Sequence, residues 1–486
     1  MYFNSYAYIF MFLPVSVIGY FLVARQWGLK ASNCWLVAAS LFFYGYWNIS
    51  YLPILVGSIL CNYAIARGIM YAQEHQDFFL KAKFLFVLGI SFDVGILVYY
   101  KYMDFFIKNF NRLLGTSWDL WHVMLPLGIS FFSITQMVYL IGVYYYGDGK
   151  KFKDFTDYCL FVSFFPHLLA GPILYHKKMM KQFADESLHS PQAENIARGI
   201  AIFVIGLFKK VIIADALLGP IGEGFAHAGE SGFYEGWVLA WLFFFEMYFD
   251  FSGYTDMAVG AARLMNFTIP INFSEPFRSK DLGEFWSRWH MSLTSTITAY
   301  IYTPLLMLLG KITVWKSVFV TMVTMIVIGA WHGAGWTFVV FGFMQGLGLG
   351  INQFYKRSPL PALPNWLSRG ITLMFVAASC ILFRADSLPQ AIEIYKGMLG
   401  MRGWEWTFQL APSASILGHG IEGTVLHGLP MMVLTLAVIL VSCCHDSNET
   451  VRTMVPNNKW AVLLAAMFVF SVLHFTQVTA FLYFQF

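Results

Sequence analysis

Long apolar stretches that carry almost no charge recur along this chain, from residues 6–24 near its start to residues 459–484 at its end. A helix of about 20 such residues crosses a hydrocarbon core roughly 30 Å thick. At that depth no water is available to pair with backbone N–H and C=O groups, so each crossing segment must form its hydrogen bonds within itself. The recurrence therefore predicts an all-α polytopic membrane protein.

Composition and charge agree with a membrane setting. Apolar residues make up 58% of the 486 residues and charged residues only 12%, which is outside the range of ordinary soluble domains. The net charge is +4, and the Lys and Arg residues gather in short loops. This is typical of the cytoplasmic loops of a membrane protein and not of a surface that binds nucleic acid. We therefore expect a lipid bilayer around the chain and no nucleic-acid partner.

The apolar runs predict a single transmembrane domain over residues 1–486, with roughly 11–13 spans plus re-entrant and amphipathic helices. Residues 1–24 carry no Lys or Arg, whereas Arg25 and Lys30 follow directly. Because cytoplasmic loops carry the excess of positive charge, the N-terminus is predicted to lie outside the cytoplasm. The expected spans are 6–24, 31–49, 51–66, 84–100, 122–146, 197–218, 233–265, 291–309, 315–331, 335–353, 366–383, 427–444 and 459–484.

Four stretches between these spans should not cross the bilayer in the ordinary way. Prolines and glycines interrupt the apolar run at 155–176, so we expect a re-entrant or kinked segment that borders a cavity. Residues 266–290 carry too many charges to span and predict a partly buried loop on the cytoplasmic side with a short amphipathic helix. Residues 387–400 predict an amphipathic helix, and residues 401–426 predict a polar loop.

One histidine, His332, lies inside the uncharged segment VIGAWHGAGWTF at 327–338, between Trp331 and Trp336. Burying an imidazole in hydrocarbon without a partner costs roughly 2–7 kcal/mol, and ionisable residues in membranes generally face a bundle interior or a watered cavity. Gly333 would let backbone or substrate approach the ring closely. The segment fits a reactive histidine, and it equally fits a histidine that only bonds a neighbouring helix.

Polar residues also interrupt the apolar run at 233–265. Asp250, Ser252 and Asp256 lie among aromatic residues in EMYFDFSGYTDMA, and Ser252 and Asp256 would share one helical face. A carboxylate at mid-bilayer costs about 2.5–3.5 kcal/mol on the insertion scale. We interpret the two aspartates as inward-facing supports that bond free amides or groups of a partner helix, rather than as acids or bases of a reaction.

The cysteines and histidines give no sign of a metal site. No CxxC pair and no metal-ligand spacing of cysteine with histidine occurs, and there is no Gly-rich phosphate loop of the GxxxxGK type. We therefore expect no metal ion and no bound cofactor. The six cysteines are Cys34, Cys61, Cys159, Cys380, Cys443 and Cys444.

Four local patterns follow one another in order: FFPHLLAGP at 164–172, YFDFSGYTDMA at 248–258, EFWSRWHMSL at 284–293 and GAWHGAGWTF at 329–338. Together they resemble the membrane-bound O-acyltransferase (MBOAT) family, most nearly its bacterial branch that contains the alginate O-acetylation membrane protein. The resemblance extends from SYAYIFMFLPV near the N-terminus to FLYFQF at the end. Each pattern alone is weak, whereas four in register are specific.

The resemblance implies a ring of transmembrane helices around a central funnel, in which a cytoplasmic acyl thioester and an extracytoplasmic acceptor meet. His332 matches the family's catalytic histidine, and His290 of RWHMS matches its second characteristic histidine. His290 also fits an interfacial anchor, because tryptophans and an arginine surround it. His167 is expected to hold the broken segment by a hydrogen bond or to line the funnel.

One stretch departs from the family pattern. Members of this branch commonly read something like SLSTWLRDYLYIPLGG after the second histidine, whereas this chain reads SLTSTITAYIYTPLLMLLG at 292–310. Thr298 and Ala299, or their neighbours, stand where that pattern has an arginine and an aspartate. The change indicates a different donor gate or partner surface.

Histidine suits acyl transfer to a hydroxyl, because a base must take the hydroxyl proton as the oxygen attacks, and a positioned base contributes about 10²–10⁴-fold. Desolvation disfavours the imidazolium form, so a site within the membrane would keep His332 neutral and able to accept a proton. Trp331, Gly333 and Trp336 would shape the walls beside it, and a backbone amide of the glycine pair would stabilise the oxyanion.

The resemblance implies a membrane O-acyltransferase that moves acetyl from cytoplasmic acetyl-CoA across a bacterial inner membrane to an envelope polysaccharide or exopolysaccharide. The polymer would be reached through a periplasmic or membrane-tethered SGNH-type acetyltransferase, because no large soluble domain for a sugar polymer is visible in the sequence. An acyl carrier protein is an alternative donor. A transporter or flippase of an envelope precursor is the alternative function, although repeat symmetry and paired substrate charges are not evident. A purely structural scaffold would leave His332 unexplained.

Overall fold

The computed structural model describes residues 1–75, 80–151, 154–404, 438, 441, 445–475 and 481–482, and the regular elements in these ranges are helices. Together with the apolar runs, this makes the chain an all-α, multi-pass membrane protein, as the sequence predicts. The chain divides into two compact units, residues 1–203 with 257–270 and residues 204–256 with 271–486. Within the described ranges, six helical runs are long and apolar enough to cross a bilayer: Ala7–Trp47, Ile49–Glu74, Ala82–Leu114, Ile129–Tyr146, Val314–His332 and Asn365–Arg384.

The first unit begins with a helical run that joins the first two expected spans. A π-helical segment, Ala7–Phe12, leads directly into α1 (Leu13–Trp47). Gly28 interrupts α1 with φ 82° and ψ −176°, a conformation that glycine adopts without the steric cost that a side chain would add. The helices expected at 6–24 and 31–49 are therefore confirmed, and a sharp backbone break separates them.

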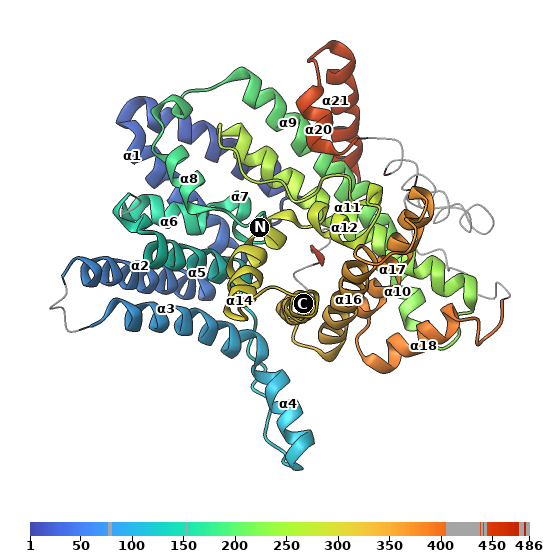
Figure 1. Ribbon diagram of the computed structural model, residues 1–486. Helices are drawn as coiled ribbons and strands as arrows, with labels where there is room; N and C mark the ends of the chain where they lie inside the picture. The colour runs from blue at the N-terminus through green and yellow to red at the C-terminus, as the bar shows by residue number, and fades with distance from the viewer. Residues whose placement is uncertain are drawn as a thin grey trace. The chain divides into compact units, whose positions relative to one another are not determined.

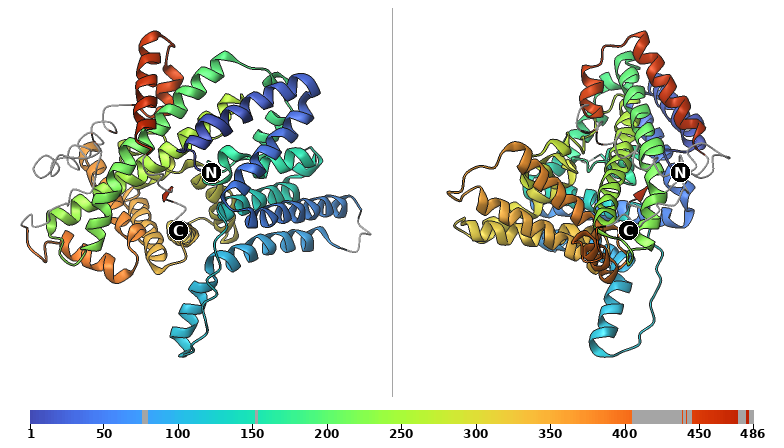
Figure 2. Two further views of the ribbon diagram at one scale, coloured as in Figure 1. Left: turned by 180° about the vertical axis from the view of Figure 1, so that it is seen from behind. Right: turned by 90° about the vertical axis from the view of Figure 1, so that its right-hand side faces the viewer.

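The next four helices of this unit follow in sequence order: α2 (Leu52–Glu74), α3 (Ala82–Leu97), α4 (Met103–Leu114) and α5 (Ile129–Tyr146). Helices α2, α3 and α5 contact one another. Figures 1 and 2 show α2 and α3 lying side by side, whereas α4 points away from them.

The start of α5 differs from the expected span at 122–146, which is wrong by several residues. Gly128 precedes the helix with φ 73°, and a Cβ at that position would lie 2.8 Å from the carbonyl oxygen of Leu168. A left-handed residue that must also let another backbone pass closely cannot lie inside a helix, so α5 begins only at Ile129.

The stretch expected to be broken at 155–176 is interrupted as predicted. Helix α6 (Phe155–Ser163) ends before the four-residue helix α7 (Phe165–Leu168), and the chain then continues without helix until α8 (His176–Phe183) begins. All residues from 158 to 174 are buried. Because buried irregular backbone must find hydrogen-bond partners in the surrounding protein, this segment belongs to the packed interior of the first unit.

Helices α9 (Ala193–Phe208) and α11 (Phe233–Leu264) pass through both units and approach each other at glycines. In the first unit, a Cβ on Gly260 would lie 2.7 Å from the carbonyl oxygen of Gly199. In the second unit, a Cβ on Gly253 would lie 2.7 Å from the carbonyl oxygen of Gly206. Small residues let helix backbones meet in membrane proteins, so these glycines set where the two helices cross.

The second unit supplies most of the remaining helices. They are α10 (Asp215–Ala226), α12 (Leu282–Arg288), α13 (Met291–Ile297), α14 (Thr303–Leu308), α15 (Val314–His332), α16 (Trp336–Tyr355), α17 (Asn365–Arg384), α18 (Leu388–Met398), α20 (Ser447–Thr453) and α21 (Asn458–Leu473). A π-helical segment, Thr298–Tyr302, joins α13 to α14. Helices occupy the ranges expected to span at 291–309, 315–331, 335–353 and 366–383, and a helix also occupies most of 387–400. Of the four expected spans, those at 315–331 and 366–383 lie in helices long and apolar enough to cross a bilayer.

The elements expected in the C-terminal part of the chain, beyond residue 400, do not all agree with the structure. The span expected at 459–484 is wrong in extent, because α21 ends at Leu473 and Leu482 instead donates its backbone N–H to the carboxylate of Asp250 at 2.9 Å. The span expected at 427–444 lies outside the described residues except for Val438 and Val441. The polar loop expected at 401–426 lies outside them beyond residue 404.

Helices α15 and α16 form a hairpin whose backbones nearly touch. A Cβ at Gly342 would fall against the carbonyl oxygen of Met325 and 2.9 Å from the Cα of Ile326. We therefore expect Gly342→Ala to cost about 1–3 kcal/mol of stability through overpacking, measured as a lower melting temperature in detergent. Gly370 in α17 is the matched control, because nothing lies within 4 Å of a Cβ built there. Equal melting temperatures for G342A and G370A would show that the hairpin tolerates a wider separation.

Candidate active site

The α15–α16 hairpin holds His332 at the point where α15 ends. Gly333 and Gly335 follow with extended backbones, and the N–H of Gly335 donates to the carbonyl oxygen of Gly333 at 3.0 Å. A Cβ on Gly333 would collide with the Phe338 ring. The glycine pair therefore permits a short link, which keeps His332 beside the first turn of α16.

The imidazole of His332 lies in an aromatic environment. His332 is only 5% exposed. The centroid of its ring lies 5.1 Å from that of Trp331 and 5.1 Å from that of Phe383 in α17. The ring centroids of Phe338 and Phe341 lie 5.1 and 5.4 Å from that of Phe383. Three helices thus shape the surroundings of one imidazole.

His290 lies between α12 and α13, outside the six candidate spans. It is 1% exposed and adopts a left-handed backbone conformation with φ 45° and ψ 50°. Its ring contacts Phe251 at 4.7 Å, edge to face, and lies 6.5 Å from Trp331. Burial lowers the pKa of His290 to about 3, so the ring is neutral at physiological pH.

Trp331 connects the two histidines, because the rings of both His290 and His332 neighbour its indole. The two residues that the sequence singles out for chemistry therefore come together within the second unit, although 41 positions separate them. Trp336 lies differently, since it is 53% exposed at the start of α16.

The predicted supports on α11 are engaged in buried ion pairs. Asp256 Oδ2 lies 2.8 Å from Lys209 Nζ, and Asp250 pairs with Lys210. Lys210 Nζ also lies 2.8 Å from Asp215 Oδ1. The supporting role of the two aspartates stays a prediction. Ser252 is buried on the same helix, and its hydroxyl has no hydrogen-bond partner among the described residues.

The sequence reasoning missed the lysines of these pairs. Lys209 and Lys210 stand in the apolar stretch FVIGLFKKVIIA, within a segment expected to span. An uninterrupted lysine pair at that place, together with two aspartates six residues apart on a second apolar run, was the signal that could have found them. Charged groups inside a membrane protein usually pair with one another.

His167 belongs to the first unit. It lies in the short helix α7, is 2% exposed, and its Nε2 forms a hydrogen bond with the carbonyl oxygen of Phe161 at 3.0 Å. This bond links α7 to the end of α6, so the first of its two expected roles, holding the broken segment, is the one with a described contact.

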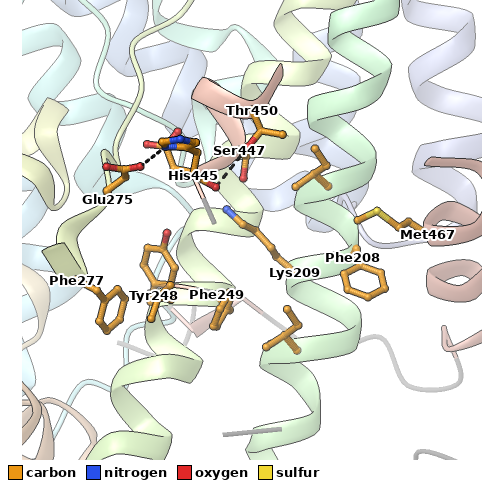
Figure 3. Close-up of a pocket in the computed structure, with 14 residues that line it drawn as sticks. Phe208, Lys209, Tyr248, Phe249, Glu275, Phe277, His445, Ser447, Thr450 and Met467 are labelled. Atoms are coloured by element: carbon orange, nitrogen blue, oxygen red, sulfur yellow. Dashed lines mark hydrogen bonds and ion pairs between the residues drawn. The ribbon is translucent and has the colours of Figure 1, made fainter. Parts of the chain in front are cut away.

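A pocket of about 200 Å³ opens in the second unit, beside the aromatic cluster that carries His290. Tyr248 lines it and contacts Phe273 at 5.5 Å, and Phe273 in turn contacts Phe251 at 5.1 Å. In Figure 3 the Lys209 side chain extends from one helix towards the loop that carries His445. The other lining residues are Ile205, Phe208, Ile213, Phe249, Glu275, Phe277, Val441, Asp446, Ser447, Thr450 and Met467.

Charged and apolar side chains both line this pocket. His445 Nδ1 lies 2.8 Å from Glu275 Oε1, as the dashed line in Figure 3 marks, and burial raises the pKa of Asp446. The His445 side chain is 64% exposed, although it is paired. Within the described part of the chain, no three His, Cys, Asp or Glu side chains gather in a way that could hold a metal ion.

Comparison with known proteins identifies the family. The sequence model of the membrane-bound O-acyltransferase (MBOAT) family matches residues 150–388. The chain is 34% identical to a peptidoglycan O-acetyltransferase of Helicobacter pylori, over 100% of this chain and 97% of that protein. It is 33% identical to a probable alginate O-acetylase AlgI of Pseudomonas aeruginosa, over 83% of this chain and 76% of that protein. A teichoic acid D-alanyltransferase of Streptococcus thermophilus is 28% identical over 48% of this chain and 57% of that protein.

The family model and the Helicobacter pylori relative cover the part of the chain that holds both histidines and the four sequence patterns. They confirm the resemblance that those patterns indicate. The chain is an O-acyltransferase and belongs to the membrane-bound O-acyltransferase family.

Proposed function

We propose that this protein carries acetyl groups from cytoplasmic acetyl-CoA across the inner membrane of a bacterium for the O-acetylation of an envelope polysaccharide or exopolysaccharide. The observation that carries the proposal is the pair of buried histidines around Trp331. The names of two relatives, a peptidoglycan O-acetyltransferase and a probable alginate O-acetylase, support acetyl as the group and a polysaccharide as its destination. In this proposal the whole chain acts as one transmembrane domain, with its helices around a central funnel and its N-terminus in the periplasm.

The proposed reaction uses His332 as the general base. Its neutral imidazole takes the proton of an acceptor hydroxyl while the hydroxyl oxygen forms a bond to the thioester carbonyl carbon. The bond from that carbon to sulfur then breaks, and the proton passes from His332 to the leaving thiolate, so that CoA leaves as the thiol. Trp331 and Phe383 hold the ring in place and exclude water, which prevents hydrolysis of the thioester.

We infer that the hydroxyl that accepts the acetyl group from this protein belongs to an SGNH-type acetyltransferase, which lies in the periplasm or is tethered to the membrane. The structure supports this division of labour in one respect. The described residues of both units are dominated by apolar helices, and a sugar polymer needs an open, polar groove. A partner with such a groove would complete the transfer.

The experiment is turnover of labelled acetyl-CoA by the purified protein in nanodiscs, with and without the candidate SGNH partner. We expect CoA release that increases when the partner is added, together with label on the partner or polymer. Acetylated acyl carrier protein is tested in parallel as the donor. Movement of an envelope precursor across the nanodisc or vesicle without any CoA release would overturn the proposal in favour of a transporter.

A further inference from the structure

The turn that carries His290 is held by a second stretch of chain, residues 271–274. The N–H of Met291 donates to the carbonyl oxygen of Asn272 at 3.0 Å, and the N–H of Ser274 donates to the carbonyl oxygen of Arg288 at 3.1 Å. The Arg288 guanidinium also donates to the carbonyl oxygen of Ser274 at 3.2 Å. These bonds lie on both sides of His290, two at Arg288 and one at Met291, so the turn is fixed at both of its ends.

The side chain of Asn272 adds a third link to this turn. Its Oδ1 accepts a hydrogen bond from the N–H of Ser292 at 3.2 Å and another from the Ser292 hydroxyl at 2.6 Å. A backbone N–H can only donate, so the atom that faces it must be Oδ1 and the amide cannot be flipped. Asn272 is 1% exposed, and its Nδ2 has no hydrogen-bond partner among the described residues.

An unsatisfied buried donor is unfavourable and needs a reason. An apolar side chain would fill this position without burying an unsatisfied Nδ2 donor. The part of Asn272 that forms hydrogen bonds is Oδ1, which accepts two. The group that benefits from those bonds is the turn after His290. His290 adopts φ 45°, which a residue with a side chain rarely does, and such a conformation persists only where its surroundings enforce it.

We propose that Asn272 is a positioning residue: its side-chain oxygen fixes the start of α13 and thereby holds the His290 imidazole in the orientation that acyl transfer requires. This inference rests on the proposed function, and it adds His290 to the reaction as the second of the two histidines around Trp331. It names a residue that acts through another residue and that touches no substrate. Misplacement of a reacting group by about 1 Å is enough to lower a rate about 10²-fold.

The test compares Asn272→Ala with Asn272→Asp in the CoA-release assay. N272A loses both bonds to Ser292, and we expect kcat to fall about 10–100-fold while the KM for acetyl-CoA stays unchanged. N272D keeps an oxygen for Ser292 and should recover most of the rate. Ser274→Ala is the matched control, because Ser274 bonds the same turn through its backbone alone and its side chain makes no hydrogen bond within the described ranges. S274A should behave as the wild type.

A double-variant comparison separates positioning from a general loss of structure. In the His290→Ala background, N272A should cause no further loss of kcat, since the group that it positions is gone. A full additional loss in that background, or equal rates for N272A and N272D with unchanged melting temperatures, would overturn the proposal. If His290→Ala itself keeps the wild-type rate while N272A loses activity, positioning of His290 is also excluded. A wild-type protein that releases no CoA would instead contradict the proposed function itself.

Discussion

Replacing His332 with alanine is expected to lower acetyl transfer by about 10²–10⁴-fold, the range that a positioned general base contributes. Without the imidazole, no group at the end of α15 accepts the hydroxyl proton while the thioester carbonyl is attacked. The rate of CoA release in nanodiscs measures the effect directly. His332→Gln should be equally inactive, because an amide fills similar space but is not a base.

Two controls make this result specific to chemistry. Histidine 75 follows the end of α2, is exposed and belongs to the first unit, so His75→Ala should retain the wild-type rate. The melting temperatures of the His332 variants are measured beside that of the wild type, because the ring packs against Trp331 and Phe383. Substantial CoA release by H332A, with clean protein and no background enzyme, would remove His332 from the reaction.

Replacing Lys210 with methionine is expected to cost about 3–5 kcal/mol of stability, as breaking a buried ion pair does. The ammonium group is 2% exposed and lies between Asp250, which is fully buried, and Asp215. Methionine leaves these carboxylates without their positive partner. The measurement is thermal unfolding in detergent together with the yield of folded protein. Because this loss of stability acts through folding, K210M that does fold should show a nearly normal KM for acetyl-CoA.

Lys30 provides the matched control for this change. It forms an ion pair with Asp154 at 3.3 Å, but its side chain is 82% exposed, and exposed pairs contribute only about 0–1 kcal/mol. Lys30→Met should therefore leave the melting temperature almost unchanged. The double variant K210M/D250N leaves one uncompensated carboxylate fewer and should recover part of the lost stability. A melting temperature of K210M equal to that of K30M would show that the Lys210 cluster does not hold the fold together.

The elements of this chain could largely be predicted, because each depends on local sequence. Apolar length fixes where helices form, and prolines and glycines fix where the segment at 155–176 breaks. The start of α5 was missed because its reason is not local: Gly128 must let the backbone at Leu168 pass. Similarly, α21 ends at Leu473 although apolar residues continue beyond it.

The candidate site could be predicted in its members but not in its contacts. His332 and His290 stand out because their surroundings in the sequence are apolar and aromatic. That both rings neighbour Trp331 depends on how α13 and α15 pack, which no periodicity in either segment encodes. The partners of Asp250 and Asp256 were missed for the same reason: a lysine some 40 residues away becomes the neighbour only when Gly206 and Gly253 have set the crossing of two helices.

The glycine contacts of the α15–α16 hairpin limit how a substrate can reach His332. Where two backbones touch directly, no layer of side chains remains that could rearrange to let the helices slide apart. We expect α15 and α16 to keep their positions relative to each other and to move as one rigid body. The side chains beside the imidazole that can move are then the rings of Trp331 and Phe383. A substrate would reach His332 when these rings rotate, and the two helices would not have to separate.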